Sequence, residues 1–426
     1  MVLEARDRLG GRLEAGTLAD RTIDLGGMWV SPSQTAVHEL LDRFGIDFYP
    51  TNLNGRLIGR VGNRSFEVEG EAYENGIGLI SRIRLGLAVA KIHRMLDDID
   101  PQAPWQSKNA NVYDRQTVLG WIEREIGDAT VRRILDFTVR SVFCAEPNEL
   151  SLLFYLFYLK AVGGLEIATE GGPGGAQNHL CVGGLHQVAS CLAGELRSKI
   201  RFSEHVVAVE QHDGVTVRTN QRQYTARRLI VAIPPAFVER IDFSPELPVA
   251  RKQLLQRQMM GSCIKVWVAY DRPFWRDAGF NGMIADDTAS FAPVFDAGPP
   301  DSDLGILAGF IESGPADEWA ERSTEDRKAM VVDTLVAAFG NEALSPIDYM
   351  ERDWTHEEWS RGCYSAFMPP GAMTRFGHSI RTPHQFVHWA GTETATEWSG
   401  YVDGAIRSGW RAAEEVIGAT SGHSSR

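Results

Sequence analysis

The sequence predicts an α/β fold in which a Rossmann-like domain is interrupted twice by a second, α+β domain. Short apolar strands followed by glycine turns occur at the start, in the middle and at the end of the chain, and runs with helical spacing separate them. At 426 residues the chain is also long for one core. We therefore assign residues 1–50, 182–254 and 357–426 to the Rossmann-like domain and residues 51–181 and 255–356 to the inserted domain.

The first part of the chain contains two strand-and-glycine units and then a helical block. Residues 2–4 end an apolar strand, a basic, glycine-rich turn follows at 6–12, and residues 23–30 form a second strand with its own glycine turn. Apolar spacing then predicts a helix at 36–44, a hairpin at 57–68 and helices at 79–96, 117–126, 130–144 and 151–162.

The second part of the chain returns to strands. A glycine-dense loop is expected at 163–184, and a hairpin is expected from a strand at 214–220 and a strand at 224–233. We further predict a strand at 264–270, a helix at 325–339, a strand at 385–390 and a final helix at 401–416.

Composition argues against several classes of protein. The formal net charge of -13 argues against a nucleic-acid partner and mildly favours a cationic small molecule. The five cysteines are scattered without a C-x-x-C pair, as expected of a cytoplasmic protein. The longest apolar run, 151–159, is followed by Lys160 and is shorter than the roughly 20 residues that span a bilayer, so we expect no membrane anchor.

The acidic residue Glu4 lies where a dinucleotide-binding fold carries the acid that binds ribose hydroxyls. That acid normally follows a G-x-G-x-x-G turn by roughly 20 residues, and no such turn precedes Glu4. The glycines at 76–78 and 171–175 lack the strand or the helix that the motif needs. An exposed acid near a terminus is therefore the alternative interpretation of this residue.

Three motifs resemble the flavin monoamine oxidase family, and the resemblance extends over essentially the whole chain. Residues 2–12 resemble the segment after its phosphate-binding helix, residues 25–30 resemble a flavin-contacting turn, and residues 391–401 (GTETATEWSGY) resemble its most specific motif. The last motif follows a strand and precedes a helix, so its backbone N–H groups can face flavin or phosphate oxygens.

The resemblance implies an FAD-binding Rossmann-like domain with an inserted substrate domain. The cofactor-binding residues that it implies are Glu4, Arg6, Gly10, Gly11, Arg12, Gly26, Gly27, Met28, Trp29, Val206, Trp354, Cys363, Gly391, Thr392, Glu393, Ser399 and Gly400. The family's first strand and its glycine turn have no counterpart before residue 1. We therefore expect an N-terminally truncated chain that binds FAD poorly.

The resemblance also implies an aromatic cage. In the membrane-bound animal enzymes, the cysteine that matches Cys363 carries the flavin as a thioether, and Tyr364 and Tyr401 match the two walls of the cage. Two parallel rings admit a flat amine and attract its nitrogen. Because Arg361 stands where the animal enzymes have a glycine, non-covalent FAD beside a buried, inert Cys363 is favoured, and a covalent thioether through Cys363 is the alternative. Core packing is the alternative role for either tyrosine.

A lysine in an apolar strand is the third implied site. Residues 261–266 resemble the family's lysine strand, so Lys265 is expected to hold a water against the flavin; a strand-edge lysine that reaches solvent is the alternative. Trp354 matches a tryptophan beside the flavin ring, and Val206 matches a residue at the adenine. Ile167 and Gln177 match residues of the substrate cavity.

We expect no metal site and no serine-hydrolase elbow. His384 and His388 are four apart, but they bracket a predicted strand, whereas a zinc pair at this spacing needs a helix. No G-x-S-x-G motif occurs.

The predicted function is FAD-dependent oxidative deamination of a small amine, with oxygen reduced to hydrogen peroxide. Lys265, Tyr364 and Tyr401 are the predicted catalytic residues, and Ile167, Gln177 and the same two tyrosines are the predicted substrate contacts. A polyamine oxidase, an amino-acid oxidase and a flavin-free remnant that serves as an interaction protein stay open as alternatives. The oligomeric state is left open, with a homodimer as the candidate.

Overall fold

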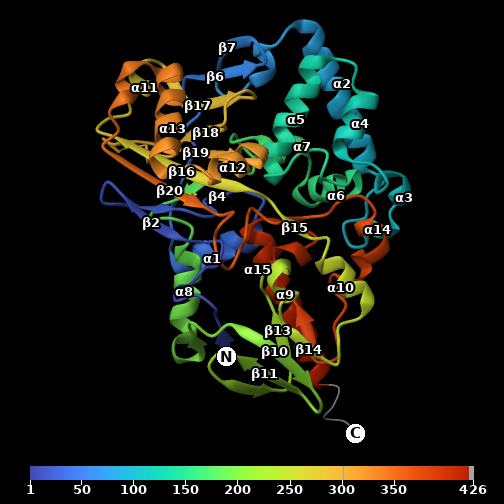
Figure 1. Cartoon of the computed structure of the whole chain (residues 1–426). Helices are drawn as coiled ribbons and strands as arrows, with labels where there is room; N and C mark the ends of the chain where they lie inside the picture. The colour runs from blue at the N-terminus through green and yellow to red at the C-terminus, as the bar shows by residue number, and fades with distance from the viewer. Residues whose placement is uncertain (301, 422–426) are drawn as a thin grey trace.

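The computed structural model describes residues 1–300 and 302–421. A large sheet and a block of helices form one end of the molecule, and smaller sheets with α1, α8 and α15 form the other (Figure 1). Strands from distant parts of the chain share the large sheet, as the predicted inserted domain requires. The domain boundaries themselves stay a prediction.

The large sheet has seven strands in the order β20-β16-β19-β18-β17-β6-β7. Their bounds are β6 Arg56–Val61, β7 Arg64–Glu69, β16 Cys263–Tyr270, β17 Phe280–Asp286, β18 Val294–Asp296, β19 Gly305–Glu312 and β20 Asp348–Asp353. β16 and β19 are buried along their whole length and pair antiparallel, with Cys263 opposite Glu312 and Lys265 opposite Phe310. Continuous apolar sequence in both strands fits a position covered on both faces.

One face of this sheet is covered by helices that follow its strands. They are α11 (Phe274–Asp277), α12 (Ser313–Ala320) and α13 (Thr324–Phe339), with the short η4 (Asn341–Leu344). Val331 and Leu335 of α13 pack in one cluster with Ile264, Val266 and Val268 of β16. The hairpin of β2 (Ala15–Leu18) and β3 (Arg21–Asp24) contributes to the cluster on the other face.

The helical block supplies one wall of the molecule's interior. Its helices are α2 (Leu79–Leu96), α3 (Ala110–Tyr113), α4 (Val118–Glu125), α5 (Ala129–Phe143), α6 (Leu152–Val162) and α7 (Leu165–Thr169), with η1 (Tyr73–Gly76) and η2 (Pro104–Gln106). The predicted buried helix is confirmed, since every residue of α6 except Lys160 is buried. The Ser151 hydroxyl caps it by accepting from the N–H groups of Leu153 and Phe154.

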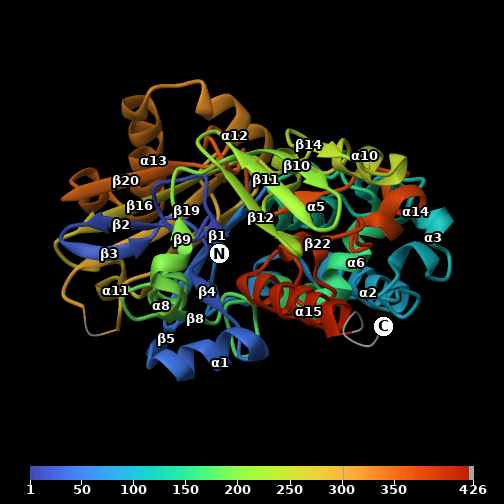
Figure 2. The same cartoon turned by 90° about the horizontal axis from the view of Figure 1, so that it is seen from below.

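The other end of the molecule contains small parallel and antiparallel sheets. β1 (Val2–Leu3) pairs parallel with β9 (Ile200–Arg201), and the N-terminus lies beside β9 (Figure 2). β10 (Val206–Gln211) pairs with β11 (Val215–Thr219) and β14 (Asp242–Ser244), while β13 (Leu229–Val231) pairs parallel with β22 (Val387–Trp389). Further elements of the chain are α1 (Thr35–Phe44), α8 (Gln187–Leu196), η3 (Arg197–Lys199), α9 (Pro235–Val238), α10 (Val249–Leu255), β15 (Met259–Met260), β21 (Ala366–Phe367), α14 (Ala372–Phe376), η5 (Gly377–Ser379), η6 (Thr392–Thr394) and α15 (Val402–Ser421); residues of α10, β21 and α14 pack into the core of the helical block.

Two sequence predictions are wrong in detail. The strand expected at 224–233 is two strands: β12 (Gln223–Ala226) pairs with β11, the chain bends at Arg227, and β13 joins β22 instead. The loop expected at 163–184 contains α7 and also β8 (His179–Cys181), which pairs with both β4 (Trp29–Val30) and β5 (Phe48–Pro50). Short strands and turns such as these are fixed by tertiary partners.

Within the described residues, every helix is too short or too polar to cross a membrane.

Candidate active site

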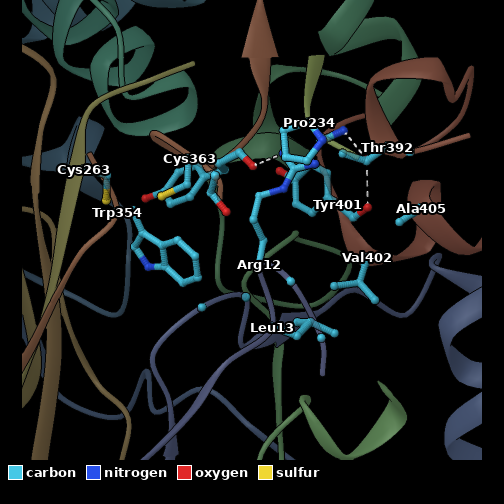
Figure 3. Close-up of a pocket in the computed structure, with 18 of the residues that line it drawn as sticks. Arg12, Leu13, Pro234, Cys263, Trp354, Cys363, Thr392, Tyr401, Val402 and Ala405 are labelled. Carbon is cyan, nitrogen blue, oxygen red and sulfur yellow. Dashed lines mark hydrogen bonds between the residues drawn. The ribbon is translucent and has the colours of Figure 1, made fainter. Parts of the chain in front are cut away.

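A cavity of about 1570 Å³ lies between the helical block, the large sheet and the smaller sheets. It brings together nineteen of the residues predicted from sequence. These are Glu4, Arg6, Gly10, Gly11, Arg12, Gly26, Gly27, Met28, Trp29, Gln177, Val206, Lys265, Trp354, Cys363, Tyr364, Gly391, Thr392, Gly400 and Tyr401. In Figure 3, Arg12 lies between Trp354 and Cys363 on one side and Tyr401 and Thr392 on the other.

Three predicted residues do not line this cavity. Glu393 lies behind Arg12 and binds its guanidinium. The Ser399 hydroxyl donates to the Thr392 carbonyl at 3.2 Å, so it supports the turn. Ile167 is half-buried against the core of the helical block. The positions of these three residues therefore do not support the direct contacts with cofactor or substrate that we predict from the sequence.

Arg12 connects three distant segments of the chain. Its guanidinium donates to Glu393 at 2.7 and 3.1 Å and to the backbone carbonyl of Tyr364 at 2.8 Å. Glu393 also accepts from the N–H of Ala366. Burial alone would raise the pKa of Glu393, but the charge and hydrogen bonds of Arg12 outweigh it and hold this pKa below its usual value. The buried pair is therefore ionised.

Tyr364 and Tyr401 both face the cavity as neutral phenols. The Tyr364 ring packs edge-on against Phe310 at 5.8 Å, and the Tyr401 ring packs edge-on against Trp398 at 4.9 Å. Burial raises the pKa of Tyr364 well above its usual value and that of Tyr401 to about 12. The peptide between Cys363 and Tyr364 is cis. Two neutral rings offer electron-rich faces to a nitrogen.

Lys265 is buried in the cavity wall and does not reach solvent, so the strand-edge alternative is wrong. Its ammonium donates to the backbone carbonyls of Asp24 at 2.8 Å and Gly26 at 2.7 Å, and it lies 3.0 Å from the sulfur of Met28. Burial lowers the pKa of Lys265 to about 7, and the charge of Asp24 opposes that shift. An amine that titrates near neutrality can hold or release a proton at the cavity wall.

The other predicted wall residues on this side are also buried. Trp354 donates from its indole N–H to the Leu25 carbonyl at 2.9 Å, which fixes the ring plane. Cys363 lines the cavity beside Cys263, and burial raises the pKa of the Cys363 thiol well above its usual value. The sulfur is therefore a thiol at neutral pH and a weak nucleophile.

The residues at this cavity fit an extended, phosphate-bearing cofactor such as FAD. Six glycines line it, so ligand atoms can approach the backbone closely. At Gly10, with φ +91°, a Cβ would lie 2.1 Å from the Leu13 carbonyl oxygen, so only glycine suits this turn. Trp29 also lines the cavity, and its buried indole N–H has no hydrogen-bond partner among the described residues. An unpaired buried donor in a cavity indicates a ligand acceptor.

Four carboxylates that the sequence reasoning missed line another part of the cavity: Glu71, Glu74, Glu166 and Glu170. Burial raises the pKa of Glu170, and the charges of the other three raise it further. Glu71 accepts hydrogen bonds of 2.7 Å from the N–H groups of Gly171 and Gly172. The i, i+4 spacing of Glu166 and Glu170 beside Ile167 was the signal available in the sequence.

A second missed residue is Glu312, which accepts a hydrogen bond from the Tyr364 hydroxyl. In the sequence, Glu312 could be recognised as the single acid at the end of an eight-residue apolar strand.

The two histidines weighed as a metal pair lie outside the cavity lining. His384 contacts the Pro245 carbonyl at 3.0 Å, and His388 pairs with Glu415 at 3.0 Å. Across residues 1–300 and 302–421, no group of three or more His, Cys, Asp or Glu side chains is arranged to hold a metal ion.

Comparisons with known proteins agree with this geometry. A family model described as "Flavin containing amine oxidoreductase" matches residues 1–417. The chain is 35% identical to "Amine oxidase [flavin-containing] A" of Equus caballus, over 98% of this chain and 80% of that protein. It is also 35% identical to "L-amino acid dehydrogenase" of Synechocystis sp., over 98% and 89%. Among solved structures, it superposes on cyclohexylamine oxidase from Brevibacterium oxydans IH-35A with a TM-score of 0.93 and 31% identity, over 99% of this chain and 94% of that one.

Proposed function

The chain belongs to the flavin-containing amine oxidoreductases, and from that premise we propose that it oxidises a small amine held between Tyr364 and Tyr401. The observation that carries the proposal is that both phenols line one cavity with Lys265 and Trp354. When bound, FAD supplies the two-electron oxidation of the amine to an imine and passes the electrons to oxygen.

The residues that would hold FAD divide along the cavity. Glu4 and Val206 would contact the ribose and adenine, and the glycine turns at Gly10 and Gly391 would approach the phosphates and ribityl chain. Lys265 and Trp354 would flank the flavin ring. Because Cys363 is a thiol at neutral pH, we propose that FAD is held without a covalent link.

The amine end of the cavity would orient the substrate and exclude water. The faces of Tyr364 and Tyr401 limit the substrate to a flat or narrow group and favour its nitrogen. Gln177 lines the cavity, and its side-chain oxygen has no hydrogen-bond partner within the described part of the chain, so we propose that it accepts an N–H of the amine. No strong base is required of the protein.

The charges of the cavity favour an amine over an amino acid. Its arginines are Arg6, Arg12, Arg228 and Arg240. Arg6 is paired with Glu357 and Arg12 with Glu393, while the other two belong to the β13–α9 region, next to the residues proposed for the nucleotide. A substrate carboxylate would therefore find no unpaired arginine at the amine end within the described residues.

A diamine or polyamine is the second candidate substrate. Glu71, Glu74, Glu166 and Glu170 line the same cavity as the two tyrosines and would attract a second ammonium group. A diamine or polyamine would undergo the same oxidation, and it would differ from a monoamine only in the contact of its second ammonium group with these glutamates.

The test is peroxide release by the FAD-loaded protein with cyclohexylamine, benzylamine, putrescine, spermidine and L-leucine. We expect turnover of at least one amine and at least tenfold lower kcat/KM with L-leucine. Replacing Tyr364 and Tyr401 together with alanine should lower kcat/KM for the preferred amine by about 100-fold or more. An unchanged kcat/KM in that double variant would refute the proposed site.

A further inference from the structure

Glu312 is a buried carboxyl group directly behind one wall of the proposed amine site. It ends β19, is 5% exposed and lies opposite Cys263 in the sheet. The Tyr364 hydroxyl donates to its Oε1 atom at 2.5 Å. The cavity lining includes Tyr364 but not Glu312, so Glu312 acts on a substrate through a lining residue, and Tyr364 is the one that it binds at 2.5 Å.

Besides Tyr364, the polar neighbours of the Glu312 carboxyl are the Cys144 thiol, 4.0 Å from its Oε1 atom, and Ser141, which lowers the pKa of the carboxyl. Glu312 precedes α12 at the N-cap position, yet its side chain makes no capping hydrogen bond. The N–H of Gly314 in that helix is instead bound by Glu146 at 3.1 Å. The cation near Glu312 is Arg140, and Arg140 is already paired with Asp136 at 2.9 Å. The hydrogen bond to Tyr364 is therefore the clearest contact that this buried group makes.

Tyr364 is held at three points, and Glu312 supplies the last. Arg12 binds its backbone carbonyl, Phe310 packs against its ring, and Glu312 binds its hydroxyl. Tyr401 packs its ring against Trp398 and Tyr158, and its side chain interacts with the Tyr158 hydroxyl rather than with a carboxyl group. We propose that Glu312 is a positioning residue that fixes the Tyr364 ring and so sets the width of the amine site, an inference that rests on the proposed function of the two tyrosines.

The ionisation of the neighbourhood agrees with this role. Burial raises the pKa of Glu312 to about 8, while the hydrogen bonds of Tyr364 and Ser141 and the charge of Arg140 oppose the rise. Burial also raises the pKa values of Cys144, Cys263 and Cys363, so the adjacent thiols are neutral. Near pH 7 the carboxyl is largely protonated and accepts from Tyr364 as a neutral group. Glutamine, which is neutral and of the same shape, should therefore replace it well.

The test compares Glu312→Leu, Glu312→Gln and Tyr364→Phe in the FAD-loaded protein. For cyclohexylamine we expect Glu312→Leu and Tyr364→Phe each to raise KM about tenfold and change kcat less than threefold. Glu312→Gln should stay within threefold of wild type. The Kd of cyclohexylamine for the dithionite-reduced protein under nitrogen should move as KM does. A double variant that combines Glu312→Leu with Tyr364→Phe should raise KM no further than either single variant does, because the two changes remove the same interaction.

Matched controls separate the outcomes. Tyr349→Phe removes another tyrosine–glutamate hydrogen bond, of 2.6 Å to Glu351, outside the cavity, and should leave KM unchanged. If Glu312→Leu leaves KM and Kd unchanged while Tyr364→Ala alters them, the positioning role is wrong and the proposed site stands. If Tyr364→Ala changes neither, the proposed site itself is wrong. Should Glu312→Leu not fold, an unchanged KM and Kd in Tyr364→Phe, which removes the same hydrogen bond, would equally contradict the inference.

Discussion

Arg12 donates a 2.8 Å hydrogen bond to the backbone carbonyl of Tyr364, so the opening segment of the chain holds one wall of the candidate amine site. The same guanidinium binds Glu393 in the turn that leads to Tyr401. One ion pair thus connects the glycine turn after β1 to both tyrosines. This arrangement makes the separation of the two rings depend on residues more than 350 positions apart.

The first prediction concerns that ion pair. Arg12→Met leaves the buried Glu393 carboxylate without its partner, which should lower the free energy of unfolding by about 3–5 kcal/mol. Adding Glu393→Gln removes the uncompensated charge and should restore at least half of the loss. Urea unfolding of the three proteins provides the measurement. A loss below about 0.5 kcal/mol in Arg12→Met would show that the pair contributes little.

The second prediction concerns Lys265 and pH. Burial lowers its pKa from 10.5 to about 7, so between these values the unfolded chain binds more protons than the native one. The free energy of unfolding of the wild type should therefore rise with pH across this window relative to Lys265→Met. The difference in free energy of unfolding between the two proteins should change by about 1.4 kcal/mol for each pH unit between pH 7 and 10.5, or about 5 kcal/mol in all. Below pH 7 this difference should not change. If the free energies of unfolding of the two proteins changed in parallel with pH, the lowered pKa of Lys265 in the folded protein would be contradicted.

The third prediction has the opposite sign and concerns Glu312. Its pKa is raised from 4.5 to about 8, so the native state holds a proton that the unfolded chain has lost between these values. Relative to Glu312→Gln, the wild type should lose stability as pH rises from about 4.5 to about 8 and should change little above that range. Unfolding measured at pH 5, 6.5 and 8.5 tests this directly. A wild type that gains stability over this range relative to the variant would show that the carboxyl is ionised in the fold.

The fourth prediction separates the two candidate substrates. Glu71→Gln combined with Glu170→Gln should raise KM for putrescine about tenfold and leave KM for cyclohexylamine within twofold, because only the diamine carries a second charge. The putrescine effect should shrink at high salt if it arises from long-range attraction. Equal changes for both amines would mean that the glutamates act on the fold or on all amines alike.

The parts of the site that were predictable from sequence lie in continuous motifs. Gly391, Thr392 and Tyr401 belong to one eleven-residue stretch between a strand and a helix, and Tyr364 follows the family's cysteine. Lys265 was recognisable because a lysine at the head of an apolar strand is costly to bury without a partner. Each of these signals is local, so the sequence alone carries it.

The parts that were missed depend on tertiary pairing. Glu312 and Tyr364 are 52 positions apart, and nothing in either segment indicates that they meet. The split of the predicted strand at 224–233 likewise depends on β22, which is more than 150 positions away. Ile167 matched a cavity residue by motif position, but the short helix α7 packs it against the helical core. Local pattern cannot decide which face of a five-residue helix is buried.

The central claim is that a flavin ring lies among Lys265, Trp354, Tyr364 and Tyr401. A crystal structure of the FAD-loaded protein tests it most directly. We expect the ring to lie in van der Waals contact with Trp354 and between Lys265 and the two phenols. A ring bound elsewhere, with the space between these four side chains filled by protein atoms, would contradict it.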